Sequence, residues 1–344
     1  MSARGRLPLA VTLGEPAGIG PDLTLAAWRR RNELDLPPFY LIGDPDFLTR
    51  RARALKLDVP LGVVNPAQAV ATFERALPVV PIDGHATALP GTPDATSAPA
   101  AIASIHRAVA DVLAGAAAAV VTNPIAKNVL YRAGFTDPGH TEYLARLAQK
   151  TTGKPVMPVM MLWAPELAVV PVTIHMALRE VFGTLTTDLI VATGHIVAHD
   201  LKARFGVACP RLALAGLNPH AGEERTLGEE DATIVAPAVA QLRADGIDAV
   251  GPLAADTMFH ERARANYDVA LCMYHDQALI PIKTLAFDRA VNVTLGLPFV
   301  RTSPDHGTAF DIAGTGKADP ASLVASLALA ARLTAAAPAL IPAK

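Results

Sequence analysis

Three histidines occupy equivalent places in the sequence, each at the end of an apolar run with the character of a β-strand. They are His175, His220 and His275, and the run Val269-Ala-Leu-Cys-Met-Tyr that precedes His275 is typical. In an open α/β sheet the carboxyl ends of the strands converge on one crevice, where ligands bind. Three neutral imidazoles gathered there would hold a divalent cation and leave a coordination position open for substrate. Any one of them could instead be an ordinary buried histidine, and the repeated placement favours a shared metal site.

Polar residues suited to anion binding accompany these histidines. The segment Gly139-His140-Thr141-Glu142 has the character of a helix start, where the positive end of the helix dipole attracts phosphate or carboxylate. Thr141 could also serve there as a simple N-cap. Further along the chain, Lys283, Asn292 and Arg301 interrupt apolar sequence. Arg and Lys are the side chains that usually bind anions, although on spacing alone these could be surface residues.

Other segments fall short of known motifs. The glycine-rich turn Gly14–Asp22 lacks the spacing of a dinucleotide fingerprint and the Lys and Ser/Thr of a P-loop. Gly314-Thr-Gly-Lys317 is not a Walker A motif, because Asp311 stands where its first glycine belongs. His195 and His199 lie one helical turn apart without the glutamate of a metalloprotease motif, so we expect them on a solvated helix face.

Composition limits the class of protein. The chain has 344 residues, 51% of them hydrophobic and 18% charged, which predicts a globular protein with two domains. A net charge of -2 argues against a nucleic-acid partner. No apolar run approaches the length of about 20 residues that crosses a membrane, so we expect no membrane partner. Only Cys209 and Cys272 are present, which suits a reducing cytoplasm.

The elements that would position these residues follow an alternating pattern. Short β-rich apolar runs alternate with longer helix-period stretches, which predicts an α/β fold with a mostly parallel sheet covered on both faces. Residues 81–99 are expected to form a surface loop with a short edge strand, and Asp319 is expected to cap a final helix that begins at Pro320. The predicted strands are 7–13, 39–43, 118–122, 156–162, 168–174, 211–217 and 269–274, and the predicted helices are 21–31, 45–55, 98–114, 124–133, 185–205, 229–244 and 320–336.

Seven motifs, in order, extend over nearly the whole chain. They are Gly14–Asp22, Thr122–Lys127, Gly139–Glu142, Gly216–Glu223, Gly251–Thr257, Met273–Gln277 and Asn292–Arg301. Together they resemble the 4-hydroxythreonine-4-phosphate dehydrogenase family of pyridoxal phosphate biosynthesis. The resemblance implies NAD-dependent oxidation and decarboxylation of 4-phosphooxy-L-threonine to 3-amino-2-oxopropyl phosphate, with a divalent metal such as zinc, cobalt or magnesium.

The resemblance also assigns residues. The metal ligands of the family match His175, His220 and His275, and its substrate contacts match His140, Thr141, Lys283, Asn292 and Arg301. All eight are present. Asp256 and Asp276 are candidates to orient a ligand imidazole or to relay a proton, and both could equally make purely structural hydrogen bonds.

A second, broader resemblance concerns the cofactor. Residues 306–320 are similar to the adenosine-binding loop of isopropylmalate and isocitrate dehydrogenases, so His306, Gly307 and Asp311 are expected to bind NAD. A carboxylate at position 311 would contact the ribose hydroxyls and repel the 2′-phosphate of NADP.

The fold implied by the resemblance has two α/β/α lobes with an interlobe cleft, like isopropylmalate dehydrogenase. Residues 1–135 and 285–344 would form lobe 1, with the NAD loop, and residues 136–284 would form lobe 2, for metal binding and dimerisation. The family forms a homodimer with a shared active site, and we expect His275 to reach across the interface.

Two alternatives remain at this stage. Related dehydrogenases with the same metal and NAD act on 4-phospho-threonate or on a dihydrodiol dicarboxylate. A non-catalytic metabolite-binding protein on the same scaffold is the other, and it predicts that a ligand or anion-binding residue has been lost. None has been lost.

Overall fold

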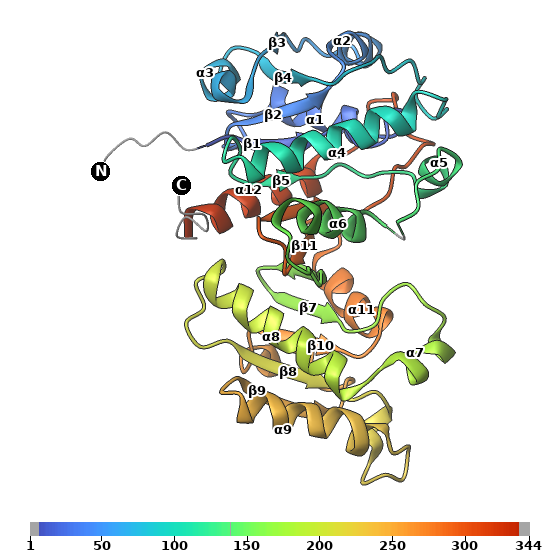
Figure 1. The fold of residues 1–344 in the computed structure, drawn as a ribbon, viewed down its shortest axis with the longest axis vertical. Coiled ribbons are helices and arrows are strands. Elements are labelled where there is room, and N and C mark those ends of the chain that lie inside the picture. Colours follow the sequence, from blue (N-terminus) through green and yellow to red (C-terminus); the bar gives the residue numbers. More distant parts are fainter. Residues whose placement is uncertain (1–6, 138, 337–344) are drawn as a thin grey trace. The chain divides into compact units, whose positions relative to one another are not determined.

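The computed structural model of the chain describes residues 7–137 and 139–336, and the chain divides into two compact units (Figure 1). The first unit comprises Met1–Met157 and Leu297–Ala335, and the second contains Pro158–Gly296. The chain therefore passes from the first unit to the second after Met157 and returns after Gly296, later than the positions near 135 and 285 expected from the sequence. Residues 1–6 and 337–344 of the expected first lobe lie outside the described residues.

The first unit has parallel strands in the order β3-β4-β2-β1-β5-β12. Its strands are β1 (Leu9–Thr12), β2 (Phe39–Gly43), β3 (Leu61–Val63), β4 (Leu77–Pro81), β5 (Val120–Val121) and β12 (Arg301–Pro304). Its helices are α1 (Gly20–Arg29), α2 (Pro45–Ala54), α3 (Ala69–Phe73), α4 (Ser97–Leu113), α5 (Lys127–Arg132), α6 (His140–Thr152) and α12 (Ala321–Ala336).

The second unit has the strand order β11-β6-β7-β10-β8-β9, in which β6 runs antiparallel to both of its neighbours. Its strands are β6 (Val159–Ala164), β7 (Leu167–Pro171), β8 (Arg211–Ala215), β9 (Asp248–Leu253), β10 (Val269–Cys272) and β11 (Val291–Leu295). Its helices are α7 (Leu178–Thr184), α8 (Thr187–Ala203), α9 (Ala236–Ala244), α10 (Glu261–Arg264) and α11 (His275–Ala286).

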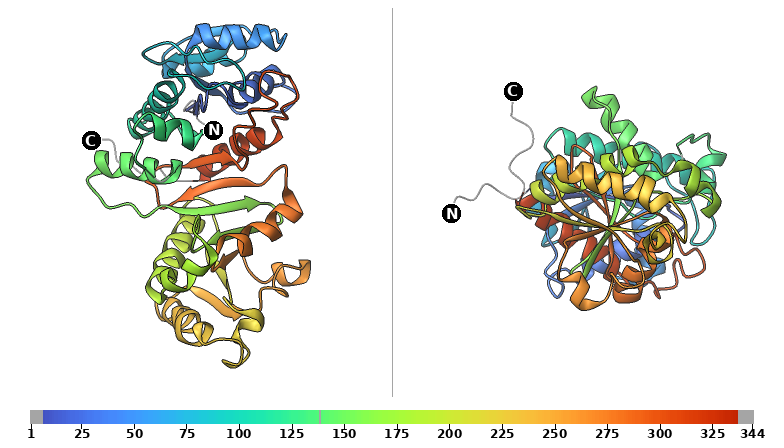
Figure 2. Two further views of the ribbon diagram at one scale, coloured as in Figure 1. Left: turned by 90° about the vertical axis from the view of Figure 1, so that its right-hand side faces the viewer. Right: turned by 90° about the horizontal axis from the view of Figure 1, so that it is seen from below.

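Helices lie on both sides of the strands in each unit (Figure 2), so the α/β class predicted from the sequence is confirmed. Strands β1, β2 and β10 are buried along their whole length, as expected for strands covered on both faces. Their continuous apolar runs are therefore a consequence of burial, and polar side chains collect where the strands end.

Some expected boundaries are wrong in detail. The strand predicted over 168–174 ends at Pro171, and the edge strand expected within 81–99 is only an isolated bridge between Leu89 and Thr92. The final helix begins at Ala321, whose N–H donates to the Asp319 carboxylate, so the expected capping side chain is the observed one. The helix predicted over 229–244 opens with a π-helical turn at Asp231–Val235 before α9.

Among the described residues no single helix is long and apolar enough to span a membrane. Helices α7 and α8 are long and apolar enough only when the two are counted together, and the chain bends by 92° between them.

Helix α6 belongs to the first unit because its apolar face packs there. Tyr143, Leu144 and Leu147 are buried in a core cluster that also contains Val109 and Val112 of α4. This packing fixes the start of α6, where His140 and Thr141 lie, in the same unit as Arg301.

We expect Leu144→Ala to lower the free energy of unfolding by roughly 2–5 kcal/mol, because it leaves a cavity beneath a fully buried side chain. Urea denaturation measures the loss. Lys150→Ala, on the exposed face of the same helix, should change the stability by no more than about 0.5 kcal/mol. Equal effects of the two substitutions would contradict this account of how α6 is held.

Candidate functional site

The three histidines follow three neighbouring parallel strands. Strand β10 pairs in parallel with β7 on one side and with β8 on the other. His175 follows the turn after β7, His220 lies in the loop after β8, and His275 is the first residue of α11 after β10. The sequence pattern therefore reflects one common carboxyl edge of the second unit, which is where ligands bind in sheets of this kind.

His175 and His275 lie close together in one chain, with ring centroids 5.6 Å apart. Asp276 Oδ1 is 2.7 Å from His275 Nδ1, and a carboxylate in that position fixes the proton on Nδ1 and leaves Nε2 with its lone pair. A hollow of about 540 Å³ is lined by these three side chains and by Leu178 and Tyr274. An ion bound about 2 Å from one nitrogen of each ring fits this centroid separation.

His220 is exposed, in a loop with unusual backbone conformation. His220, Ala221 and Glu223 all have positive φ, at 51°, 54° and 38°. Such strained residues persist only where their surroundings hold them. The buried Asp231 carboxylate does this, because its two oxygens accept the N–H groups of Leu217 and Asn218, at 2.7 and 3.0 Å.

Gln277 connects the ends of two of the strands. Its Oε1 accepts the N–H of Met273 at 2.7 Å, and its Nε2 donates to the carbonyl of Gly216 at 2.7 Å. The loops that carry His220 and His275 are thereby tied together. Sequence reasoning did not assign Gln277 a role, although it stands within the motif Met273–Gln277.

Other predicted residues of the second unit surround this group or lie apart from it. Lys283 lines a shallow hollow together with His275 and Asp276. Asn292, on β11, has a buried Oδ1 with no hydrogen-bond partner among the described residues, which is a favourable position for a ligand donor. Asp256 is exposed in the turn after β9, and it is not among the described residues that line either hollow beside His275.

A second group of predicted residues lies in the first unit. Arg301, at the start of β12, is buried, and its guanidinium donates to Thr122 Oγ1 through Nε at 3.1 Å and Nη2 at 2.6 Å. His140 begins α6, and its Nε2 is buried with no hydrogen-bond partner among residues 7–137 and 139–336. Thr141 lies within the first turn, so the simple-cap interpretation is wrong: the N-cap is Gly139.

Burial controls the charges of this group. It lowers the pKa of His140 well below the usual value, and the positive charge of Arg301 lowers it further. Burial also lowers the pKa of Arg301 to about 10, against the opposite effect of the Glu142 carboxylate. At neutral pH the group therefore contains a neutral imidazole beside a guanidinium cation, which can accept a phosphate or carboxylate. Thr122 and Glu142 were not singled out from the sequence, although both lie in its motifs.

The residues expected to bind NAD lie on an irregular loop after β12. His306, Gly307 and Asp311 are all exposed. A Cβ atom added at Gly307 or at Gly316 would meet nothing within 4 Å, so the loop surface is open at both positions. An accessible carboxylate on an open surface fits the hydroxyls of a ribose.

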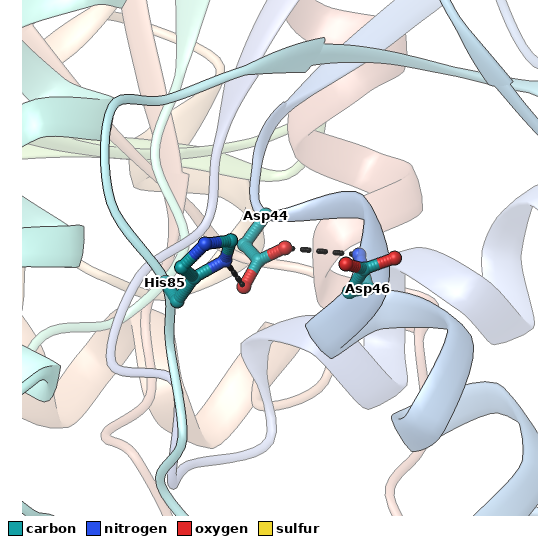
Figure 3. A group of neighbouring side chains, drawn as sticks. All are labelled: Asp44, Asp46 and His85. Carbon is teal, nitrogen blue, oxygen red and sulfur yellow. Dashed lines mark hydrogen bonds and ion pairs between the residues drawn. The ribbon is translucent and has the colours of Figure 1, made fainter.

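Asp44, Asp46 and His85 are the one group of three potential metal-ligating side chains found within the described ranges (Figure 3), and His175, His220 and His275 do not form such a group within one chain. Asp44 Oδ1 accepts the Asp46 N–H and Oδ2 accepts the Ala86 N–H, both at 2.9 Å. Asp44 is the N-cap of α2. Since these two bonds explain the buried carboxylate and the other two side chains are exposed, we assign the group a structural role.

Comparisons relate the chain to known proteins. Residues 35–330 match the family model described as "Pyridoxal phosphate biosynthetic protein PdxA". A 4-hydroxythreonine-4-phosphate dehydrogenase of Bradyrhizobium diazoefficiens is 65% identical over 344 residues, covering 98% of this chain and 99% of the relative. The crystal structure of a 4-hydroxythreonine-4-phosphate dehydrogenase from Klebsiella pneumoniae has a TM-score of 0.84 at 38% identity, covering 95% and 99% of the two chains. A terephthalate 1,2-cis-dihydrodiol dehydrogenase from Burkholderia xenovorans has a TM-score of 0.64 at 28% identity, covering 95% and 98%.

The lowered pKa of His140 makes a prediction about stability and pH. The unfolded chain takes up a proton at this histidine near its usual pKa of about 6.5, whereas the folded chain does so only at lower pH. The stability contributed by neutral His140 is therefore present above about pH 6.5 and is lost as the pH falls below it, by up to about 1.4 kcal/mol per pH unit. Urea denaturation of His140→Gln should show a shallower loss than the wild type. His106→Gln, at an exposed site on α4, should keep the wild-type slope, and an unchanged slope in His140→Gln would refute the prediction.

Proposed function

Since this chain belongs to the PdxA family and is an oxidoreductase of the 4-hydroxythreonine-4-phosphate dehydrogenase type, we propose that it oxidises 4-phosphooxy-L-threonine with NAD and a divalent metal. Hydride passes from the secondary alcohol carbon to NAD, and the hydroxyl group releases its proton as the ketone forms. The resulting 3-oxo acid loses carbon dioxide and takes up a proton, so the products are 3-amino-2-oxopropyl phosphate, carbon dioxide and NADH. The observation that carries the proposal is the arrangement of His175, His275 and Asp276 at the carboxyl edge of the second unit.

His175, His220 and His275 would hold the metal. Imidazole donors suit zinc or cobalt better than magnesium, which prefers oxygen ligands. When bound, the ion supplies Lewis acidity for the alcohol oxidation and for the decarboxylation. Asp276 keeps the proton on His275 Nδ1, so the lone pair of Nε2 is available to the metal.

The anion-binding residues would hold the substrate's phosphate and carboxylate. Arg301 supplies a positive charge at neutral pH in a buried setting, where hydrogen bonds to an anion are strong. His140, neutral at pH 7, can donate a hydrogen bond without adding charge, and Thr141 stands in the first helical turn beside it. Lys283 and Asn292, which belong to the second unit, are the other two residues that we assign to substrate binding.

The cofactor would be NAD, with His306, Gly307 and Asp311 at its adenosine. The accessible Asp311 carboxylate supports NAD over NADP, because it would repel a 2′-phosphate.

A homodimer with a shared metal site completes the proposal. Leu178 and Phe182 on α7, Ile280 on α11 and Phe287 just after α11 are 50% to 74% exposed, and Leu178 and Ile280 line hollows that also contain His275. Exposed apolar surface of this kind marks an interface. His175 and His275 are close enough to act together from one chain, which favours His220 as the ligand from the partner. The arrangement expected from the sequence, in which His275 alone crosses the interface, is the alternative.

Activity tests the reaction. NADH absorbance should rise when the protein is mixed with 4-phosphooxy-L-threonine, NAD and zinc or cobalt, and a chelator should abolish it. Asp276→Asn should lower kcat/KM and metal affinity by about 10- to 100-fold, because the carboxylate that keeps the proton on His275 Nδ1 is lost. Asp288→Asn, exposed after α11, is the matched control and should be unaffected. Turnover of 4-phospho-threonate or a dihydrodiol dicarboxylate in place of the expected substrate would reject the substrate assignment.

Mixed dimers test the sharing of ligands. Each inactive variant, His175→Ala, His220→Ala or His275→Ala, is unfolded and refolded with another. If His175 and His275 act from one chain, the pair His220→Ala with His275→Ala should recover about a quarter of wild-type activity, because half of the dimers then contain one intact site. The pair His175→Ala with His275→Ala should stay inactive. Recovery in both of these pairs would instead assign His275 to the partner, and no recovery in any pair would argue against a shared site.

A further inference from the structure

We propose that the buried ion pair of Asp22 and Arg51 is a positioning device for the cofactor, which holds the loop over residues 306–316 in its binding conformation. The inference rests on the proposed function, since it takes this loop to be the one that binds NAD. All the residues involved belong to the first unit.

Arg51 reaches from α2 to the glycine-rich turn at the start of α1. Its side chain is 2% exposed, and Nη1 bonds to the Asp22 carboxylate, itself 4% exposed. The same guanidinium donates from Nη2 to the carbonyl of Pro16 at 2.6 Å and from Nη1 to the carbonyl of Gly18 at 3.2 Å. A planar fork of donors can satisfy several acceptors at once, which an ammonium group does less well.

Asp22 carries the connection on to the cofactor loop. While Oδ1 binds Arg51, Oδ2 accepts the backbone N–H of Gly314 at 2.6 Å. One carboxylate therefore joins two segments that are almost the whole chain apart in sequence. Burial raises the pKa of Asp22, and the charge of Arg51 opposes that effect, so Arg51 favours the ionised form of the carboxylate.

Backbone contacts beside the pair show how closely the two segments fit. The N–H of Ile19 donates to the carbonyl of Thr308 at 3.0 Å. A Cβ atom added at Gly18 would come within 2.9 Å of that same carbonyl oxygen, so only glycine allows the approach. Gly91 also contacts both segments: its N–H donates to the carbonyl of Ala17 at 2.8 Å, and a Cβ atom added to it would come within 2.8 Å of the Phe310 carbonyl oxygen.

The chemistry of the pair points to positioning. A buried ion pair contributes little net stability compared with apolar residues of the same size, and in some proteins its role is to specify one geometry. Here those groups are the carbonyls of Pro16 and Gly18 and the N–H of Gly314, in two different loops. Asp311 lies in the second of these loops and remains exposed. A preorganised loop binds its ligand without the cost of ordering.

The test compares Arg51→Met and Arg51→Lys with a matched control. Arg107→Met removes the arginine of another Arg–Asp pair of the first unit, with Asp111, which lies at the end of α4. Isothermal titration measures the Kd for NAD, and steady-state kinetics separates kcat from the KM of each substrate. Hydrogen exchange of residues 14–19 and 308–316 without cofactor reports loop order, and circular dichroism establishes that each variant is folded.

In Arg51→Met the Kd and KM for NAD should rise on the order of tenfold to a hundredfold, with kcat at saturating NAD and the KM of the phosphorylated substrate within about twofold. Exchange should quicken in both segments. Arg51→Lys, which keeps the charge, should fall between Arg51→Met and the wild type, and it serves as the test if Arg51→Met does not fold. Arg107→Met should leave NAD binding and both segments unchanged.

Two results would overturn the inference: unchanged exchange in both segments of the Arg51 variants, or faster exchange with unchanged affinity for NAD. Equal increases in the KM for NAD and in the KM for the phosphorylated substrate would also contradict it, since a general structural defect would produce them. Wild-type protein that does not bind NAD would reject the proposed function itself, and that result is distinguishable because it does not depend on the variants.

Discussion

The structure depends on one constraint, the burial of parallel strands on both faces. Strand β10 is buried along its whole length and contains no charged side chain, so the polar residues of this segment, Tyr274, His275 and Asp276, lie beyond its end. Because β7, β10 and β8 run in parallel as neighbours, their ends form one edge. The sheet therefore brings the three candidate metal-binding histidines of the second unit to one edge, and the loops at that edge orient their side chains.

Orienting these loops requires buried polar side chains that hold them in place, and the same kind of contact occurs three times. Gln277 joins the ends of β8 and β10, Asp231 holds the loop of His220, and Asp22 joins the first glycine-rich turn to Gly314. In each case a side-chain oxygen accepts backbone N–H groups that no strand or helix satisfies. Buried polar groups of this kind must be paired, so they fix loops more firmly than apolar contacts do.

Sequence reasoning could predict what repeats locally and could not predict what pairs at a distance. The α/β class and the placement of His175, His220 and His275 follow from apolar runs and their ends. The bond from Arg301 to Thr122 joins residues 179 positions apart, and no local pattern indicates it. The start of the second unit was expected too early because periodicity identifies α6 as a helix without saying which core its apolar face enters.

The charges of the proposed anion-binding group, Arg301 and His140, show how burial can prepare a site before its ligand binds. Removing Arg301 from water is costly, and that cost is met when the first unit folds. Its pKa of about 10 still leaves it charged at neutral pH. A phosphate or carboxylate bound there would interact with a cation that has already lost its water. His140 stays neutral because burial lowers its pKa and the positive charge of Arg301 lowers it further. A single buried cation with a neutral donor thus provides strong attraction for an anion with little reorganisation on binding.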